Sequence, residues 1–238
     1  MKTLLIALSL CALVHSAGVA GGAAIPEENL SPSERLEALV EQIRQAHEEL
    51  ETLEAEFSQT KESALLVESE RAHGVFSFAA PDKVRWEYLT PDPISLVIAD
   101  RMMTTWYRDL RQVERAEVGA HSDRVLRYLG AGTSLDSLLE YFSVSLAVPT
   151  PDSESLHLSL EPRFKRVAKR LRGLDLWLDP DTYMPMRLRY VEGDGDVTEY
   201  SFTSVKLNEA LPAERFELEL PLDVDVRSVE IGGRSGAR

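Results

Sequence analysis

The stretch that decides the fold is GVFSFAAPDKVRWEYLTPDPISLVIADRMMTTWY, residues 74–107. Within it, large apolar side chains recur at every second position, as at Trp86 and Tyr88, while Arg85 and Glu87 occupy the positions beside them. This period of two is that of a β-strand with one covered and one solvated face. Proline and aspartate separate successive runs, with no helical segment between them, which predicts an antiparallel meander.

A helix is expected before these strands. Ser31, Pro32 and Glu34 have the residue types and spacing of an N-cap, a first helical position and a capping box. Apolar residues then recur with the period of a helix as far as Leu50, and strand-like alternation begins at Leu53. The sequence therefore predicts a helix that begins after Ser31 and buries one apolar stripe.

Two short helices are expected to interrupt the strands. Residues 122–129 and 133–142 each begin with a good N-cap residue, and a Gly-Ala-Gly sequence joins them. Alternation returns in residues 155–160 and 174–180, and a later hairpin is expected to turn at residues 193–196. The predicted fold is α+β and mainly antiparallel β. It is a strongly curved sheet, or unclosed β-barrel, with three helices covering the open apolar face.

The two ends of the chain are expected to lie outside the folded domain. Residues 1–24 have an early lysine, an apolar run and small residues, which are the features of a secretory signal peptide. An uncleaved membrane anchor, or a lipoprotein modified at Cys11, the only cysteine, are the alternatives. Residues 25–227 are predicted to form one domain and residues 228–238 a disordered tail.

The composition argues against several functional classes. The net charge of -14 disfavours a nucleic-acid partner, because such binding depends on neutralising phosphates. The five histidines have no metal-ligand spacing, and the sequence contains no G-x-S-x-G motif, Walker loop or G-x-G-x-x-G motif. The Gly-Asp-Gly-Asp sequence at residues 193–196 is typical of a turn. The protein is therefore predicted not to be an enzyme and to need no cofactor or metal.

The apolar face of the sheet either fills a core or lines a cavity that a ligand enters. Tyr88 and Trp106 bear polar atoms that need partners when buried, and short, glycine-hinged helices suit a lid more than a permanent layer. We therefore predict a lipid-binding cavity lined by Phe76, Phe78, Val84, Trp86, Tyr88, Ile94, Leu96, Ile98 and Trp106. The apolar residues of the predicted lid are Val125, Leu126, Leu129, Leu135, Leu138, Leu139 and Phe142.

Residues 74–107 resemble the central segment of the LolA-like outer-membrane lipoprotein carrier family. In that family, a strand ending in proline is followed by an R-W-x-Y strand, a proline-rich turn, an aliphatic strand and an aromatic strand. Here the corresponding positions are Pro81, residues 85–88, 91–93, 94–98 and 106–107. Three further segments, residues 55–62, 174–190 and 211–226, resemble other parts of the family, so that the resemblance extends over residues 33–226.

The resemblance implies a monomeric periplasmic carrier that holds lipoprotein acyl chains in an apolar cavity and transfers them towards the outer membrane. Its implied partners are acylated lipoproteins or lipid, an inner-membrane lipoprotein-releasing transporter and an outer-membrane receptor. A lipid-sensing regulatory protein, or a carrier of another lipid or glycolipid, is the alternative on the same fold. The chain departs from the family at Ala80. Well-studied members have a lid-fixing arginine there, so that role is not transferred to this chain.

A basic cluster stands out in this otherwise acidic chain. It consists of Arg163, Lys165, Arg166, Lys169 and Arg170, followed by Arg172. Such residues are either an ordinary solvated segment, in which they discourage unwanted strand pairing, or a docking patch that orients a carrier towards its membrane partners.

Overall fold

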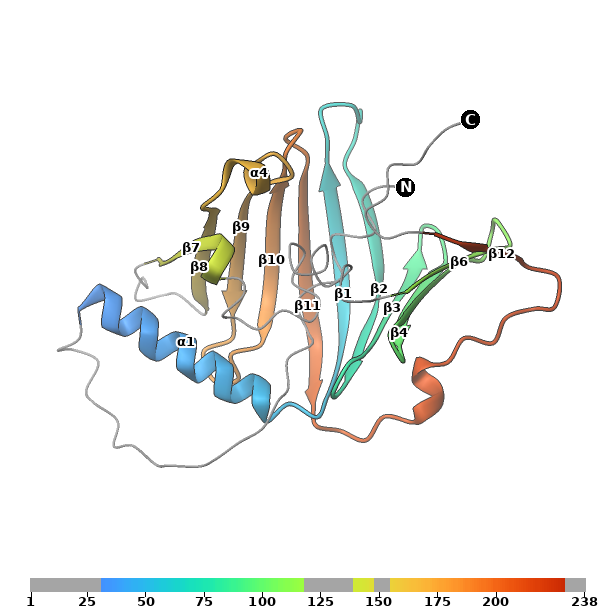
Figure 1. The fold of residues 1–238 in the computed structure, drawn as a ribbon, viewed down its shortest axis with the longest axis horizontal. Helices are drawn as coiled ribbons and strands as arrows, with labels where there is room; N and C mark the ends of the chain where they lie inside the picture. Colours follow the sequence, from blue (N-terminus) through green and yellow to red (C-terminus); the bar gives the residue numbers. More distant parts are fainter. Residues whose placement is uncertain (1–30, 118–138, 148–154, 230–238) are drawn as a thin grey trace.

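One sheet dominates the described part of the chain, which in this computed structural model comprises residues 31–117, 139–147 and 155–229. Its strands are β1 (Thr52–Glu62), β2 (Glu70–Ala79), β3 (Lys83–Thr90), β4 (Ile94–Ala99), β5 (Met102–Tyr107), β6 (Gln112–Glu117), β7 (Phe142–Leu146), β8 (Leu156–Pro162), β9 (Leu171–Leu178), β10 (Pro185–Glu192), β11 (Val197–Leu207) and β12 (Asp225–Ser228). The strand order is β12-β6-β5-β4-β3-β2-β1-β11-β10-β9-β8-β7 (Figure 1). Neighbours are antiparallel except β12 and β6, which are parallel.

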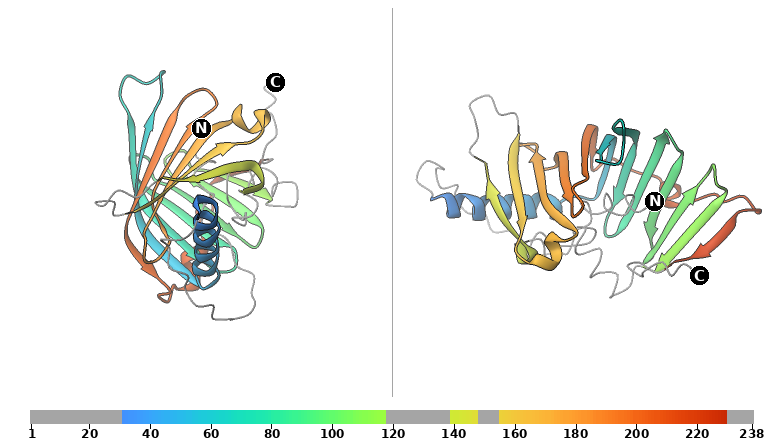
Figure 2. Two further views of the ribbon diagram at one scale, coloured as in Figure 1. Left: turned by 90° about the vertical axis from the view of Figure 1, so that its left-hand side faces the viewer. Right: turned by 90° about the horizontal axis from the view of Figure 1, so that it is seen from above.

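The sheet is strongly curved and does not close on itself. Figure 2 shows the strands bending around α1 (Pro32–Glu48), and β7 and β12 lie at opposite ends of the strand order. Leu39 and Ile43 of α1 are buried in one core cluster with the leucines of β8, β9 and β10. The hydroxyl of Tyr183, in the β9–β10 turn, donates a 3.1 Å hydrogen bond to Oε1 of Gln42. The helix therefore covers the concave side of one half of the sheet.

Both ends of α1 are fixed by side-chain hydrogen bonds. At the start, Ser31 Oγ accepts from the Glu34 N–H at 3.3 Å, and Glu34 Oε2 accepts from the Ser31 N–H at 2.8 Å, which confirms the predicted capping box. After the last turn, Asn208 Oδ1 accepts from the Glu51 N–H at 2.7 Å, and the Asn208 amide donates to the Glu49 carbonyl at 3.1 Å. The α1–β1 turn is therefore attached to the end of β11.

The side chains of strand β3 alternate between the two faces of the sheet. Trp86 and Tyr88 are buried on the concave face, while Arg85 and Glu87 point to the convex face. The Glu87 carboxylate accepts hydrogen bonds from Arg85 and Arg108, both at 2.6 Å. Burial alone would raise the pKa of Glu87, but the hydrogen bonds from Arg108 and Arg85 outweigh it, and the pKa lies below its ordinary value.

The chain after β11 covers part of the convex face. The short 3-10 turn η3 (Ala213–Phe216) packs against β3 and β4, and the side chain of Phe216 is buried there. Arg85 fixes this segment, because one of its guanidinium nitrogens donates at 3.0 Å to the carbonyls of Arg215 and Glu217. The apolar side chains on the outer side of β4 are therefore shielded by residues 213–220.

Replacing Glu87 by glutamine is expected to reduce the pH dependence of stability. Because the folded pKa of Glu87 is lowered, its contribution is present above the unfolded pKa near 4.5 and is lost as pH falls through the folded value. The variant should lose about 1–2 kcal/mol of unfolding free energy at neutral pH. Its urea midpoint should then fall less than that of the parent between about pH 5 and pH 3. The same change at exposed Glu219 is the control, and equal acid sensitivity of all three proteins would contradict the prediction.

Gly74 of β2 lies against the backbone of β3 and in front of an aromatic ring. A Cβ atom at this position would lie 2.0 Å from the Glu87 carbonyl oxygen and 2.6 Å from the ring of Phe57. The β2–β3 register shifts between His73 and Gly74, which is a β-bulge of the kind that bends strongly curved sheets. The absence of a side chain therefore allows the Phe57 ring to rest on the backbone at the centre of the concave face.

The predicted unclosed, strongly curved and mainly antiparallel sheet is confirmed, as is the hairpin turn, in which the Glu192 N–H donates to the Asp196 carbonyl at 2.8 Å. The prediction missed β7, β12 and the short helix α4 (Lys165–Ala168). The predicted signal peptide, the helix at residues 122–129 and most of the helix at residues 133–142 lie outside the described residues.

Two predicted boundaries are wrong. Phe142 was predicted to end a helix, but it begins β7, because it pairs with Pro162 of β8. The tail was predicted to begin at residue 228, but Ser228 pairs with Arg115 of β6, and the Val229 N–H donates to the Arg115 carbonyl at 2.8 Å. In both cases pairing with a strand elsewhere in the chain decides the boundary, because it makes Phe142 and Ser228 strand residues.

Candidate functional site

An aromatic cluster occupies the concave face where β1, β2, β3 and β11 meet. The ring of Phe57 is edge-on to Trp86 and Tyr88, with centroids 4.9 and 5.0 Å away. The Trp86 ring lies 4.7 Å from that of Phe76 and 5.5 Å from that of Tyr200. Edge-to-face ring contacts stabilise a core beyond simple burial. The aromatic cluster therefore fixes the shape of the concave face at its centre.

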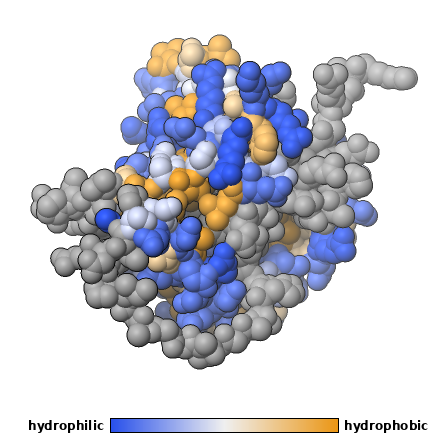
Figure 3. Space-filling view, turned by 60° about the vertical axis from the view of Figure 1, so that its left-hand side comes forward, coloured by the Kyte–Doolittle hydropathy of each residue, from blue (hydrophilic) through white to orange (hydrophobic). Residues whose placement is uncertain are grey.

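Eight of the nine residues predicted to line a cavity share this concave face. Ile94 is half-buried, and the other seven are buried, namely Phe76, Phe78, Val84, Trp86, Tyr88, Leu96 and Ile98. The strand register places Phe76, Trp86 and Leu96 directly side by side. These side chains form a packed apolar face, and Figure 3 shows apolar surface between hydrophilic regions on one side of the molecule.

The predicted position of Trp106 on this face is wrong. Trp106 pairs with Ser95 of β4 and Val113 of β6, and these positions lie on the opposite side of the sheet from Leu96. Its ring is covered by the guanidinium of Arg108 at 4.8 Å. Trp106 therefore belongs to the convex face and does not line the concave one.

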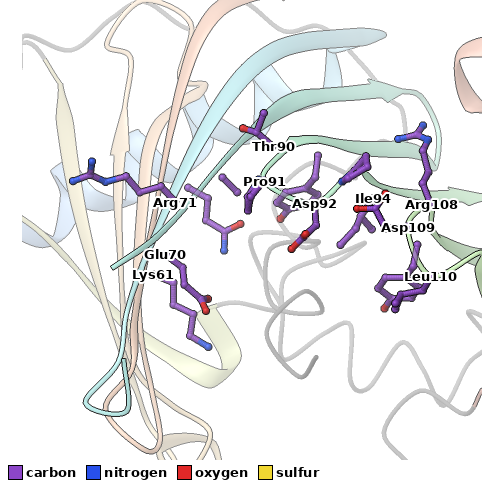
Figure 4. Close-up of a pocket in the computed structure, with 15 residues that line it drawn as sticks. Lys61, Glu70, Arg71, Thr90, Pro91, Asp92, Ile94, Arg108, Asp109 and Leu110 are labelled. Atoms are coloured by element: carbon purple, nitrogen blue, oxygen red, sulfur yellow. The ribbon is translucent and has the colours of Figure 1, made fainter. Parts of the chain in front are cut away.

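A pocket of about 530 Å³ opens beyond the aromatic cluster, at one end of strands β1 to β5. In Figure 4, Lys61 and Glu70 lie on one side of it and Asp109 and Leu110 on the other, with Asp92 between them. The remaining lining residues described are Gln59, Arg71, Ala72, Tyr88, Thr90, Pro91, Pro93, Ile94, Tyr107 and Arg108. The pocket has the size of a small-molecule site. It joins the apolar face to a rim of mixed charge.

Sequence reasoning identified only Tyr88 and Ile94 among the residues that line this pocket. The available signal was the continuation of the period of two along β1, in which Gln59 and Lys61 follow Phe57 on the same side of the strand. A polar residue at the end of a buried strand face indicates that the face reaches an opening there. No such pattern indicates Asp92 or Asp109, because both lie in turns.

Four buried hydroxyls, those of Tyr88, Tyr190, Thr198 and Tyr200, form a hydroxyl cluster on the concave face. The Tyr88 and Tyr200 oxygens lie 3.2 Å apart and share one hydrogen bond. Burial raises the pKa of Tyr88 to about 12, and it also raises the pKa values of Tyr190 and Tyr200. All three phenols are therefore protonated and uncharged at neutral pH.

Two residues of the predicted lid, Leu139 and Phe142, fall within the described residues. Phe142 is fully buried in the core cluster at the start of β7, and Leu139 is half-buried. The other five, Val125, Leu126, Leu129, Leu135 and Leu138, lie outside the described residues.

The residues of the predicted docking patch, Arg163, Lys165, Arg166, Lys169 and Arg170, are all exposed at the end of β8 and around α4. Two of them contact neighbouring groups. Arg163 Nε donates to the Phe142 carbonyl at 2.9 Å, and the Arg166 guanidinium lies 5.6 Å from the ring centre of Phe164. The basic side chains therefore form one solvent-facing group at one corner of the sheet.

The described residues offer no alternative site based on a metal. Over residues 31–117, 139–147 and 155–229, no three histidine, cysteine, aspartate or glutamate side chains are grouped in a way that could hold a metal ion. None of the helices in these ranges is both long enough and apolar enough to cross a bilayer.

Comparison with known proteins agrees with the fold. Residues 48–219 match the family model of the outer membrane lipoprotein carrier protein LolA. The outer-membrane lipoprotein carrier protein of Chromobacterium violaceum is 27% identical over 216 residues, which cover 91% of this chain and 96% of that protein. The protein of the same name from Pseudomonas entomophila is 25% identical over 187 residues, which cover 79% of this chain and 86% of that protein.

Among solved structures, an uncharacterized conserved protein from Thermus thermophilus is similar, with a TM-score of 0.54 at 11% identity. The match covers 82% of this chain and 99% of that one, and at this identity it bears on the fold alone. The family model, by contrast, matches well over half of the chain. With its unclosed antiparallel sheet and apolar concave face, this chain belongs to the LolA family of outer-membrane lipoprotein carriers.

Proposed function

We propose that this protein binds the acyl chains of lipoproteins in the apolar concavity of its half-barrel and carries them through the periplasm towards the outer membrane. The proposal is supported above all by a continuous apolar concave face that leads into an open pocket of about 530 Å³. Each methylene group removed from water contributes about 0.8 kcal/mol, so that ten contribute about 8 kcal/mol. Binding of this strength shields acyl chains that would otherwise aggregate or remain in a membrane.

The rim of the pocket suits the polar part of such a cargo. Lys61 and Arg71 lie on the β1–β2 side, and Asp92 and Asp109 lie in the turns across from them. An acylated lipoprotein has apolar chains joined to a polar peptide, so one end of the ligand requires an apolar site and the other requires water or polar groups. The proposed role is binding and transfer of this cargo without any chemical change to it.

Transfer requires a donor and an acceptor. We propose an inner-membrane lipoprotein-releasing transporter as the donor and an outer-membrane receptor as the acceptor, as the family resemblance implies. The proposed export signal at residues 1–24 would place the carrier in the compartment between them.

The proposal is tested by identifying what the protein binds in the cell. The mature protein is purified from the periplasm without detergent, extracted with organic solvent and analysed by mass spectrometry, with a periplasmic protein of similar size as the control. Acylated peptides or lipoproteins in stoichiometric amounts are expected. Free phospholipid or glycolipid alone would identify a carrier of another lipid, and a clean extract would contradict the binding role.

We also propose that the exposed basic group at residues 163–170 orients the carrier towards its membrane partners. Replacing Arg166, Lys169 and Arg170 by serine should slow cargo delivery to receptor-bearing vesicles, while the affinity for cargo stays unchanged. The difference should shrink towards about 0.1 M salt, where the screening length is about 10 Å.

A variant with the same change in net charge elsewhere is the matched control. In this control, Arg101, Lys206 and Arg227, which are all exposed, are replaced by serine. The change removes three positive charges that lie elsewhere on the surface. If both triple variants deliver cargo at the parental rate, the basic group is ordinary surface. A loss of cargo affinity instead would place it at the rim of the binding site.

A further inference from the structure

The hydroxyl cluster is an unexpected feature of a face otherwise built from apolar side chains. Tyr88 is 4% exposed, Tyr190 1%, and Thr198 and Tyr200 are fully buried. They come from β3 and from the β10–β11 hairpin, which are distant in the sequence but meet on the concave face. Each hydroxyl removed from water must make a hydrogen bond or incur a cost of about 1–3 kcal/mol.

The hydrogen bonds within the cluster do not satisfy its donors. Tyr88 and Tyr200 share one bond at 3.2 Å, so only one of their two protons is used between them. Tyr190 faces Thr198 across the β10–β11 ladder, and it is close enough for the pKa of Tyr190 to respond to Thr198 and Tyr200. Nevertheless, the Tyr190 hydroxyl, the Thr198 hydroxyl and the nearby indole N–H of Trp86 have no well-formed hydrogen bond among the described residues.

The cluster adjoins the open pocket through one of its four members. Tyr88 lines the pocket directly. Gln59 and Lys61, which also line it, stand opposite Tyr200 and Thr198 in the β1–β11 register. A ligand that occupies the pocket of Figure 4 therefore meets the cluster at Tyr88.

The chemistry of the cluster defines the group that it fits. Hydroxyl and indole protons are donors, and an oxygen with lone pairs and no proton is their best partner. The cluster itself contains no cationic side chain, and a buried charge without a counter-charge is costly. A neutral carbonyl oxygen meets both conditions, whereas an alkyl chain offers no acceptor and an ether oxygen is a weaker one.

We propose that the hydroxyl cluster binds the carbonyl oxygens of ester- or amide-linked acyl chains, so that the site selects acylated ligands over hydrocarbon or ether-linked ones. The inference rests on the proposed carrier function and names the part of the cargo that is recognised. Tyr190 and Thr198 donate to the carbonyl, and the Tyr88–Tyr200 pair supplies a further proton. The linkage between acyl chain and headgroup is thereby held at a fixed depth, with the acyl chains on the apolar face and the headgroup at the charged rim.

The test compares two ligands that differ only in the linkage. Dioctanoyl phosphatidylcholine and its dioctyl ether analogue have equal chains and the same headgroup, and both are titrated below their aggregation concentration by calorimetry. We expect the parent protein to bind the ester about five- to tenfold more tightly, as one or two hydrogen bonds allow. A diacylated cysteine peptide is the third ligand, because its amide and ester carbonyls distinguish a lipoprotein source from a phospholipid source.

The double variant Tyr190→Phe, Thr198→Val removes the two donors and preserves the shape of the site. It should lose most of the ester preference, because only the free proton of the Tyr88–Tyr200 pair remains to bind a carbonyl. Its ligand-free form should be as stable as the parent or more stable, because two unpartnered hydroxyls are removed; a structural role of these hydroxyls would give the opposite result. Tyr183→Phe is the control, since this hydroxyl bonds to Gln42 of α1, and it should leave the ester preference unchanged.

The possible results separate the inference from the function on which it rests. Equal binding of ester and ether by the parent would overturn the carbonyl inference and leave the carrier proposal standing. An ester preference that is undiminished in the double variant would overturn it as well, because the selection would then reside elsewhere. Failure of the parent to bind any of the three ligands would overturn the carrier proposal and the inference together.

Discussion

A Trp86→Ala variant is expected to lose about 3–5 kcal/mol of unfolding free energy. The Trp86 ring is 3% exposed and contacts Phe57, Phe76 and Tyr200, so its removal leaves a cavity at the centre of the aromatic cluster. The measurement is urea denaturation followed by circular dichroism. The same preparation should also bind a hydrophobic fluorescent probe more weakly, because the concave face loses its largest apolar side chain.

Trp177→Ala is the matched control for this prediction. Trp177 is half-buried on the convex face, where its ring stacks on His157 at 4.5 Å beneath the guanidinium of Arg187. Its loss should cost about 1 kcal/mol and leave probe binding unchanged. If the two variants were equally stable, or if only Trp177→Ala weakened probe binding, the assignment of the concave face would be wrong.

Gly74→Ala should be almost as disruptive, although it adds only one methyl group. The new Cβ would lie 2.0 Å from the Glu87 carbonyl, and that oxygen belongs to the backbone of a central strand, which has little freedom to move. Overpacking at a site of this kind costs about 1–3 kcal/mol and in the tightest cases more, so we expect a loss of about 3 kcal/mol. Thermal denaturation measures it.

A neighbouring substitution on the same strand provides the comparison. Ala72→Gly makes a change of the same size in the opposite sense at a half-buried position of β2 and should cost about 1 kcal/mol or less. A Gly74→Ala protein as stable as the parent would show that the Phe57 ring and the β2–β3 bulge rearrange at little cost.

The central strands could be predicted from the sequence because their two faces differ in polarity. In β3, the alternation of Trp86 and Tyr88 with Arg85 and Glu87 determines the buried side without further information. The start of α1 was equally well defined, since the capping box is a local pattern. Local signals of this kind require no knowledge of the partner strand.

The face of β5 could not be predicted, because its sequence MMTTWY does not alternate in polarity. The side on which Trp106 lies is decided by the turn before it, where Asp100 and Arg101 both adopt positive φ angles, 51° and 61°. This two-residue turn pairs Met102 with Ala99, and it thereby assigns Thr105 to the concave face and Trp106 to the convex one. A shift of one residue in the β4–β5 register would exchange the faces on which Thr105 and Trp106 lie.

The edge strands and the pocket rim were beyond sequence reasoning for a related reason. β12 has four exposed residues and exists only because β6 offers a free edge to it. The pocket residues Asp92 and Asp109 come from separate turns that the curvature of the sheet brings together. Curvature is a property of the whole sheet, and no short sequence window encodes it.

The bond that attaches Asn208 to the α1–β1 turn has a consequence for how the protein acquires its shape. Asn208 follows Glu51 by 157 positions, and the β1–β11 ladder that continues from it joins strands almost as distant in the chain. Sheets dominated by such non-local pairings have a high contact order and fold in about milliseconds to seconds, since a long loop must close before the pairing stabilises it. The β1–β11 ladder, which joins β1–β6 to β7–β11 in the sheet, therefore forms only after β11 is available. If the chain is exported from its N-terminus, as proposed above, it has no finished concavity until almost all of it has been translocated.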